Sequence, residues 1–174
     1  MRPQQQQFLT LALRRAARGS GSSPRFLSRR TAMQPLPNLA SMLGPIPWVL
    51  VGGFAIRAYI PERTTQDVDI LIHTDAEPAA RAALSAAGYQ ITAPRFTAER
   101  PGAMPIDVLT GQQSWLDQAL AAPEHDAAGY PVLARPYLML LKLQAGRMQD
   151  LTDVQRMLRD TPTAERQTTA AMLT

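Results

Sequence analysis

Two carboxylates interrupt an apolar segment in the middle of the chain, Asp67-Val68-Asp69-Ile70-Leu71-Ile72. The segment predicts a strand over residues 66–72. Because the side chains of a strand alternate between its two faces, we expect Asp67 and Asp69 on the same face, roughly 6.5–7 Å apart. Ionised carboxylates this close repel each other and are costly to desolvate. A hard divalent cation, which prefers oxygen ligands, is the usual compensation, so the pattern predicts a metal site.

A third acid, Asp107, lies in another apolar segment, between Ile106 and Val108. If its strand is the neighbour of the Asp67–Asp69 strand, three carboxylates converge at one end of a sheet. Such a site can hold two Mg²⁺ or Mn²⁺ ions, which bind a nucleoside triphosphate and stabilise the attacking and leaving oxygens of an in-line displacement. One Asp-x-Asp pair is frequent by chance and Asp107 by itself could cap a turn, so the prediction depends on the three acids together.

A glycine pair, Gly52-Gly53, follows the apolar segment 48–51 directly and is separated from Asp67 by 13 residues. This pattern predicts a buried strand over 48–51 and a helix over 52–60 that begins at the glycines. Backbone N–H groups at the start of a helix suit a phosphate group. The alternative is that the glycines only permit a tight turn under close packing. The spacer favours the phosphate interpretation, because one helix and a turn would bring the glycines and Asp67 to the same edge of the sheet.

The only lysine of the chain, Lys142, lies among leucines near the C-terminus. A lone charge in that place indicates an acidic or phosphate partner, unless its stem lies along apolar surface and its ammonium reaches water. Asp150 and Asp153 are three residues apart and share one face of the last predicted helix. They can also serve that helix as an N-cap and as a first-turn acid that complements its dipole.

Length and composition predict one folded domain, because 174 residues with 45% hydrophobic content can bury a core. No apolar run approaches the roughly 20 residues needed to cross a bilayer. The lack of cysteine excludes disulfides and thiolate metal sites but leaves the compartment open, and a cytoplasmic location fits and is expected. Residues 1–33 hold seven arginines and no acid, whereas residues 34–174 hold 11 basic and 14 acidic residues. The charge of the folded part therefore gives no support to a nucleic-acid acceptor.

The chain is expected to divide into a disordered basic extension over residues 1–34, a folded domain over 35–160 and a flexible tail over 161–174. The Arg- and Ser-rich extension also fits a transit peptide or a nucleic-acid-binding arm. Within the domain, helices are predicted over 36–43, 52–60, 77–87, 114–122, 135–144 and 150–159, and strands over 48–51, 66–72, 89–92, 106–109 and 130–133. Several connections are too short for parallel crossovers, which predicts an α+β fold with helices flanking a mixed sheet.

The ordered set of motifs resembles the nucleotidyltransferase superfamily with the DNA-polymerase-β-type palm. Its signature is a hydrophobic strand, Gly-Gly or Gly-Ser, a spacer, Asp-hydrophobic-Asp and a later strand-borne Asp, matched by Val51-Gly52-Gly53, Asp67-Val68-Asp69 and Asp107. Over residues 36–160 the chain is most similar to the small AbiEii/AbiGii toxin-associated branch. The residues that carry this similarity are Gly52-Gly53-Phe54-Ala55, Arg63-Thr64-Thr65-Gln66-Asp67-Val68-Asp69, Lys142, Ala145, Arg147, Asp150 and Asp153.

The resemblance implies a nucleotidyltransferase fold and a Mg²⁺- or Mn²⁺-dependent transfer of a nucleoside monophosphate from an NTP to a hydroxyl of RNA or protein. It implies that Asp67, Asp69 and Asp107 bind the metals and are catalytic together with Lys142, and that Asp107 helps to activate the hydroxyl. It assigns nucleotide binding to Gly52, Gly53, Arg63, Thr65 and Asp150. It also implies a cognate toxin or antitoxin as partner.

Two alternatives remain open. The first is an inactive nucleotide-binding or antitoxin module of the same fold. It is favoured by the short chain and by Gly53, which lacks the hydroxyl that a serine often supplies to phosphate at this position of the family. The second is a site for Ca²⁺ or a structural metal, which leaves the glycine pair unexplained.

Overall fold

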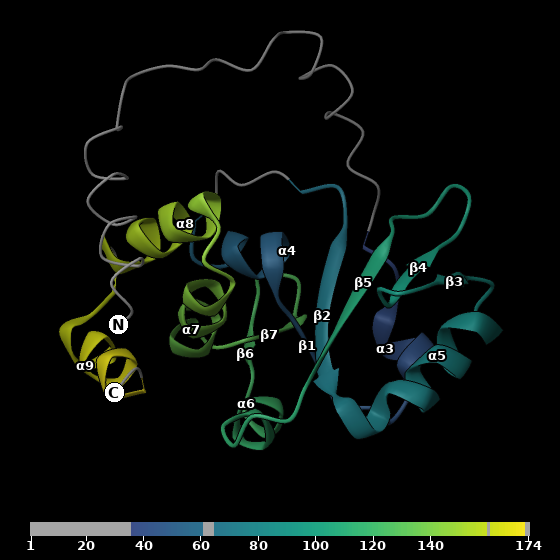
Figure 1. The fold of residues 1–174 in the computed structure, drawn as a ribbon, viewed down its shortest axis with the longest axis horizontal. Helices are drawn as coiled ribbons and strands as arrows, with labels where there is room; N and C mark the ends of the chain where they lie inside the picture. The colour runs from purple at the N-terminus through teal and green to yellow at the C-terminus, as the bar shows by residue number, and fades with distance from the viewer. Residues whose placement is uncertain (1–35, 61–64, 160, 173–174) are drawn as a thin grey trace, which may run out of the picture. The chain divides into compact units, whose positions relative to one another are not determined.

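The computed structural model describes residues 36–60, 65–159 and 161–172. Over these residues the centre of the structure is a seven-stranded sheet in the order β3-β4-β5-β2-β1-β7-β6 (Figure 1). The strands are β1 (Trp48–Leu50), β2 (Val68–His73), β3 (Gln90–Thr92), β4 (Thr97–Glu99), β5 (Ile106–Gly111), β6 (Glu124–His125) and β7 (Pro131–Val132).

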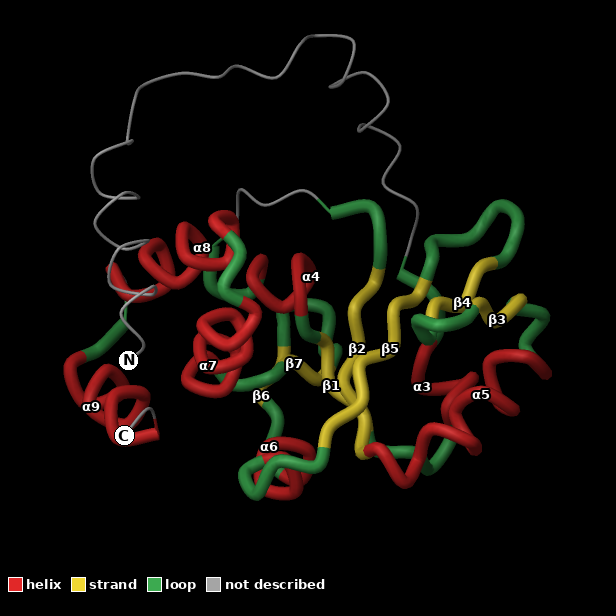
Figure 2. Tube along the Cα trace, viewed as in Figure 1, coloured by secondary structure: helices red, strands yellow, loops and turns green. Residues whose placement is uncertain are grey.

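Helices surround the strands, as the colours of Figure 2 show. In this view α3 and α5 lie toward the β3–β4 end of the sheet, and α4, α7 and α8 toward its β1–β7 end. The described helices are α3 (Leu39–Leu43), α4 (Gly52–Arg57), α5 (Glu77–Ala86), α6 (Leu116–Ala121), α7 (Arg135–Ala145), α8 (Met148–Arg159) and α9 (Thr163–Met172), with a 3₁₀ turn at Thr74–Ala76.

The sheet is mixed, as the short connections predict. Strand β2 pairs with β5 in parallel and with β1 in antiparallel orientation, and β1 pairs with β7 in parallel. On β2 the side chains of Val68, Ile70 and Ile72 are fully buried in the core, so the intervening Asp69 belongs to the opposite face. The α+β fold with flanking helices is therefore confirmed.

Three segments differ most from the prediction. Strand β6, which pairs with β7, lies where no strand is predicted. Strand β4 lies where the sequence suggests only a Pro- and Arg-rich loop, because three residues are too few to show a hydrophobic period. Its buried Ala98 is nevertheless paired with Ile106 of β5. In the segment predicted to be a flexible tail, the structure has helix α9, which packs on α7 and is linked to it by an ion pair of 3.6 Å between Arg135 and Glu165.

The domain limits 35–160 remain a prediction, and the basic extension lies outside the described residues. Among the helices that the structure describes, each is too short or too polar to cross a bilayer.

Candidate active site

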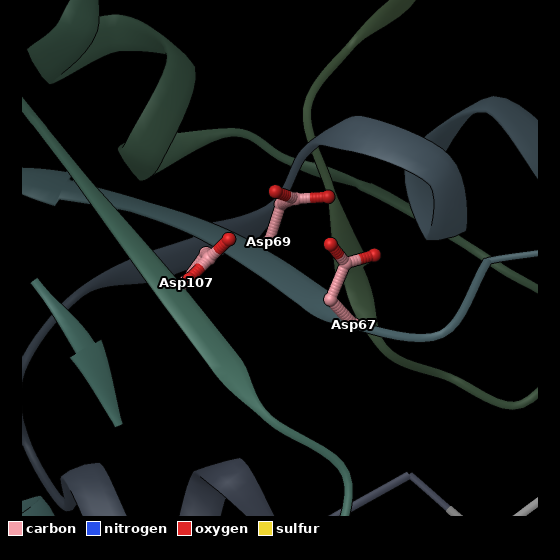
Figure 3. A group of neighbouring side chains, drawn as sticks. All are labelled: Asp67, Asp69 and Asp107. Carbon is pink, nitrogen blue, oxygen red and sulfur yellow. The ribbon is translucent and has the colours of Figure 1, made fainter. Parts of the chain in front are cut away.

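Three carboxylates meet on one face of the sheet, where β2 and β5 run side by side. Asp69 and Asp107 are register partners in this parallel pair, and Asp67 comes immediately before β2. One oxygen from each of the three lies within 4.8 Å of the others, and all three side chains are half-buried. Figure 3 shows them on the same side of the two strands. The sequence predicts that the three carboxylates converge if their strands are neighbours, and the pairing of β2 with β5 brings them together in this way.

Each of the outer carboxylates accepts a hydrogen bond from a threonine. The Thr65 hydroxyl donates to Asp67 Oδ1 at 2.6 Å, and the Thr97 hydroxyl on β4 donates to Asp107 Oδ1 at 2.6 Å. Asp69, in the centre, accepts a hydrogen bond from the backbone N–H of Gly53. The cluster is therefore held by the loop before β2, by the start of α4 and by β4.

The glycine pair is shaped by these contacts. Gly52 has φ of +59°, a conformation that favours glycine, and a Cβ at this position would overlap the carboxylate of Asp69. A Cβ at Gly53 would come within 2.6 Å of the Thr65 Cβ and 2.7 Å of its hydroxyl oxygen. Close packing thus accounts for both glycines. Their predicted contact with a triphosphate stays a prediction, and the Gly53 amide is used by Asp69.

Burial raises the pKa of the Asp69 carboxyl to about 6, and repulsion from Asp67 adds to the rise. Repulsion from Asp107 also raises this pKa, while the Gly53 amide and the positive charge of Lys142 lower it. Burial and the neighbouring carboxylates both disfavour the charged form of Asp69, and a bound cation would favour it. Among the described residues, no lysine or arginine forms an ion pair with any of the three carboxylates.

The donor set fits a hard divalent cation. All three groups offer carboxylate oxygens, the ligands that Mg²⁺ and Mn²⁺ prefer over softer metals. Two oxygens on opposite sides of one Mg²⁺ ion lie about 4.2 Å apart, twice the usual bond length, and the oxygens here lie within 4.8 Å of one another. The residues present are therefore compatible with the metal that the sequence predicts.

A second group of charges, the helical ion cluster, consists of Lys142, Arg147, Asp150 and Asp153 on α7, α8 and the turn between them. The turn is set by Gly146, whose φ of +66° ends α7 and whose N–H bonds to the Lys142 carbonyl at 3.0 Å. Lys142 Nζ then lies 2.7 Å from Asp150 Oδ1 and 3.0 Å from Asp153 Oδ2. The lysine and both acids are buried, at 6%, 2% and 2% exposure.

Burial by itself would raise the pKa of the Asp150 carboxyl, but hydrogen bonds from Arg147 and Lys142 outweigh it and hold this pKa below its usual value. Arg147 Nε lies 2.6 Å from Asp150 Oδ2, with its side chain 77% exposed. Asp150 is thus an ionised, buried carboxylate with both oxygens engaged.

The structure brings together some predicted site residues and separates others. Asp67, Asp69, Asp107 and Thr65 form one cluster. Lys142 has the acidic partners that its position indicated, and it acts on Asp69 only through its charge. Asp150 belongs to the same buried pairing, and Arg63 lies outside the described residues. The catalytic and nucleotide-binding roles of all these predicted site residues remain proposals.

Thr97 is the residue that sequence analysis missed. Its segment, Phe96-Thr97-Ala98-Glu99, alternates apolar and polar residues, which is the pattern of a half-buried strand. This alternation is the one signal that could have indicated a strand there, although it covers only four residues.

The chain is similar in structure to known nucleotidyltransferases. The solution structure of the antibiotic-resistance factor ANT(2'')-Ia aligns with a TM-score of 0.51 and 14% identity, covering 74% of this chain and 82% of that one. A crystal structure of ANT(2'')-Ia in complex with adenylyl-2''-tobramycin aligns with a TM-score of 0.47 and 17% identity, covering 73% of this chain and 86% of that one. An antigenic nucleotidyltransferase-like protein from Paracoccidioides brasiliensis aligns with a TM-score of 0.45 and 18% identity, covering 78% of this chain and 81% of that one.

At the level of sequence, no family model and no curated protein matches the chain. What the structural likeness establishes is the architecture: a mixed sheet with flanking helices, shared with ANT(2'')-Ia at low identity. The chain has the nucleotidyltransferase fold.

Proposed function

We propose that the chain is a Mg²⁺- or Mn²⁺-dependent nucleotidyltransferase that moves a nucleoside monophosphate from an NTP to a hydroxyl group. The observation that carries this proposal is the cluster of Asp67, Asp69 and Asp107, with oxygens within 4.8 Å on one face of a sheet of this fold. Three acids without a described cationic partner are poorly explained as structural residues, because their repulsion opposes folding.

The divalent ions, when bound, would neutralise the triphosphate and stabilise charge on the oxygens of the displacement. Asp67 and Asp69 would hold the ions, and Asp107 would share in binding them. In the reaction the α-phosphorus forms a bond to the acceptor oxygen and its bond to pyrophosphate breaks. Asp107, whose Oδ1 is taken by Thr97, would accept the hydroxyl proton at its other oxygen. Positioning and electrostatics suffice for this step, and no covalent intermediate is needed.

We propose RNA or protein as the carrier of the acceptor hydroxyl, and a toxin–antitoxin pair in the cytoplasm as the setting. Both proposals are supported by the motif set Gly52-Gly53, Asp67-Val68-Asp69 and Lys142 to Asp153, which resembles the AbiEii/AbiGii branch. The acidic balance of residues 34–174 favours protein over RNA between the two.

A second candidate is a nucleotide-binding module of the same fold without turnover. It is favoured by Gly53, which offers no hydroxyl and whose amide bonds to Asp69 rather than standing free for a phosphate.

A transfer assay distinguishes the two candidates. The full chain is incubated with each α-³²P-labelled NTP, Mg²⁺ or Mn²⁺, and either total cellular RNA or lysate protein, and label in the acceptor and released pyrophosphate are measured. Metal-dependent labelling that is lost in Asp69→Asn supports the enzyme. Metal-dependent NTP binding without labelling in any arm supports the module, and the absence of both contradicts the site.

A further inference from the structure

The two outer carboxylates of the cluster are held in the same way from different parts of the chain. The Thr65 hydroxyl donates to one oxygen of Asp67, and the Thr97 hydroxyl donates to one oxygen of Asp107, both at 2.6 Å. This is a short distance for a hydroxyl–carboxylate hydrogen bond and belongs to the stronger, charge-assisted class. Among the described residues, no further hydrogen bond engages the second oxygen of Asp107.

The Thr97–Asp107 bond arises from the register of the sheet. Thr97 on β4 is the direct antiparallel partner of Asp107 on β5, so their side chains lie on the same face. Asp107 is in turn the parallel partner of Asp69 on β2. Three neighbouring strands therefore place a hydroxyl, a carboxylate and a second carboxylate in one row across the sheet.

A hydrogen bond to one carboxylate oxygen fixes the rotation of the group and so decides where the other oxygen points. Groups that orient metal ligands in this way commonly change metal affinity by about 10–100-fold when removed. We propose that Thr97 is a positioning residue of the metal site, which holds Asp107 Oδ1 so that Oδ2 is presented to the divalent ion and to the acceptor hydroxyl. This inference rests on the proposed function, because it requires that the cluster bind a metal.

The competing explanation is that Thr97 and Asp107 are an ordinary cross-strand pair, which stabilises the pairing of β4 with β5 and nothing else. The chain offers a matched control in Thr92. It lies on β3 directly opposite Thr97, and its hydroxyl donates to the Thr97 backbone oxygen at 3.3 Å rather than to a carboxylate. Replacing either threonine with valine removes one hydroxyl from the β3–β4 hairpin, and valine is a residue that suits a strand.

The test measures Mn²⁺ binding to the full-length chain by electron paramagnetic resonance of the free ion, without nucleotide. Thermal melting is followed in parallel. The proteins are the wild type, Thr97→Val, Thr97→Ser, Thr92→Val and Asp69→Asn. We expect Thr97→Val to weaken Mn²⁺ binding roughly tenfold. Serine at 97 should restore most of the affinity, because it keeps the donor, and Thr92→Val should bind as the wild type does.

Equal Mn²⁺ affinity in Thr97→Val and the wild type would overturn the inference and leave the metal site standing. If Thr97→Val melts too early to be titrated, Thr97→Ala takes its place and Thr92→Ala becomes the control. A Thr97→Ala protein that binds Mn²⁺ as tightly as Thr97→Ser and Thr92→Ala do would again reject a positioning role. If the wild type binds Mn²⁺ no better than Asp69→Asn does, the metal site itself fails, and the proposed function falls together with this inference.

Discussion

The molecule contains two groups of acids that differ in how their charge is compensated. In the sheet cluster of Asp67, Asp69 and Asp107, the carboxylates receive hydrogen bonds from hydroxyl and amide groups but form no ion pair with a described residue. In the helical ion cluster, Asp150 and Asp153 contact Lys142 at 2.7 and 3.0 Å, and Asp150 also contacts Arg147. The first group is half-buried, whereas the second has both acids almost fully buried.

The difference separates a candidate cation site from a group of charges that are already compensated within the protein. Two acids and two basic residues balance one another, so Lys142, Asp150 and Asp153 can be buried between α7 and α8 without a bound cation. The three acids of the sheet cluster form no such ion pairs with the described residues, and burial together with repulsion from Asp67 raises the pKa of Asp69 to about 6. Three neighbouring carboxylates without a cationic partner among the described residues favour the binding of a cation from solution.

The largest expected effect is on the stability of the helical ion cluster. Lys142→Met leaves Asp150 and Asp153 buried without their shared ammonium, and breaking a buried pair in this way typically lowers the free energy of unfolding by about 3–5 kcal/mol. Urea unfolding at pH 7 measures the loss. A stable Lys142→Met protein with at least tenfold weaker NTP binding would instead mean that the lysine faces the triphosphate, the outcome favoured by the sequence alone.

Loss of a charge from the sheet cluster should affect stability in the opposite direction from the loss of Lys142. Asp69→Asn removes a negative charge from a site with an excess of them, so the melting temperature should stay the same or rise. Mn²⁺ affinity should fall by more than about 100-fold, because loss of a ligand exceeds the effect of losing its supporting group. Titration calorimetry and thermal melting measure the two quantities. Unfolding of Asp69→Asn would identify Asp69 as a structural residue and remove the contrast between the clusters.

Metal binding should depend on pH through Asp69. Its pKa of about 6 in the folded protein means that the proton must leave before a cation binds, so Mn²⁺ affinity should fall about tenfold per pH unit below 6.

The stability of the metal-free protein should change with pH in the opposite direction. The folded state holds this proton more tightly than the unfolded state with its pKa near 3.8, so this contribution declines as pH rises from about 4 to 6.

The difference between the wild type and Asp69→Asn isolates this contribution from other titrating groups. In the absence of metal, the stability of Asp69→Asn relative to the wild type should increase across the same pH interval. A flat difference between pH 4 and 7 would show that the Asp69 pKa is not raised.

The smallest effect is expected at Arg147. Its side chain is 77% exposed, and Asp150 keeps the Lys142 ammonium after Arg147→Ala. The free energy of unfolding should therefore fall by only about 1 kcal/mol, because an ion pair whose arginine is exposed to solvent contributes little. Denaturant unfolding beside Lys142→Met checks the order. A loss as large as that of Lys142→Met would mean that Arg147, rather than the lysine, carries the compensation of Asp150.

Much of the local structure follows from patterns within one segment. The helix predicted over 77–87 is α5 at Glu77–Ala86, because Pro78 in its first turn and Gly88 beyond its end mark both limits. Helix α4 is shorter than predicted, ending at Arg57, and β2 begins at Val68 rather than at residue 66, so Asp67 precedes the strand. Boundaries of this kind depend on hydrogen bonds to neighbouring elements, which a single segment does not encode.

The sequence by itself determined the kind of chemistry: acids within apolar segments, a glycine pair at a fixed distance before them, and one lysine among leucines. Only the tertiary structure decided which of these meet. Asp69 stands beside Asp107 through strand register, Thr97 reaches Asp107 from a strand too short to be recognised, and Lys142 is turned toward Asp150 and Asp153 by the α7–α8 packing. Residue types and spacing fix what a side chain can do, whereas contacts between distant segments depend on pairing and packing energies summed over the whole fold.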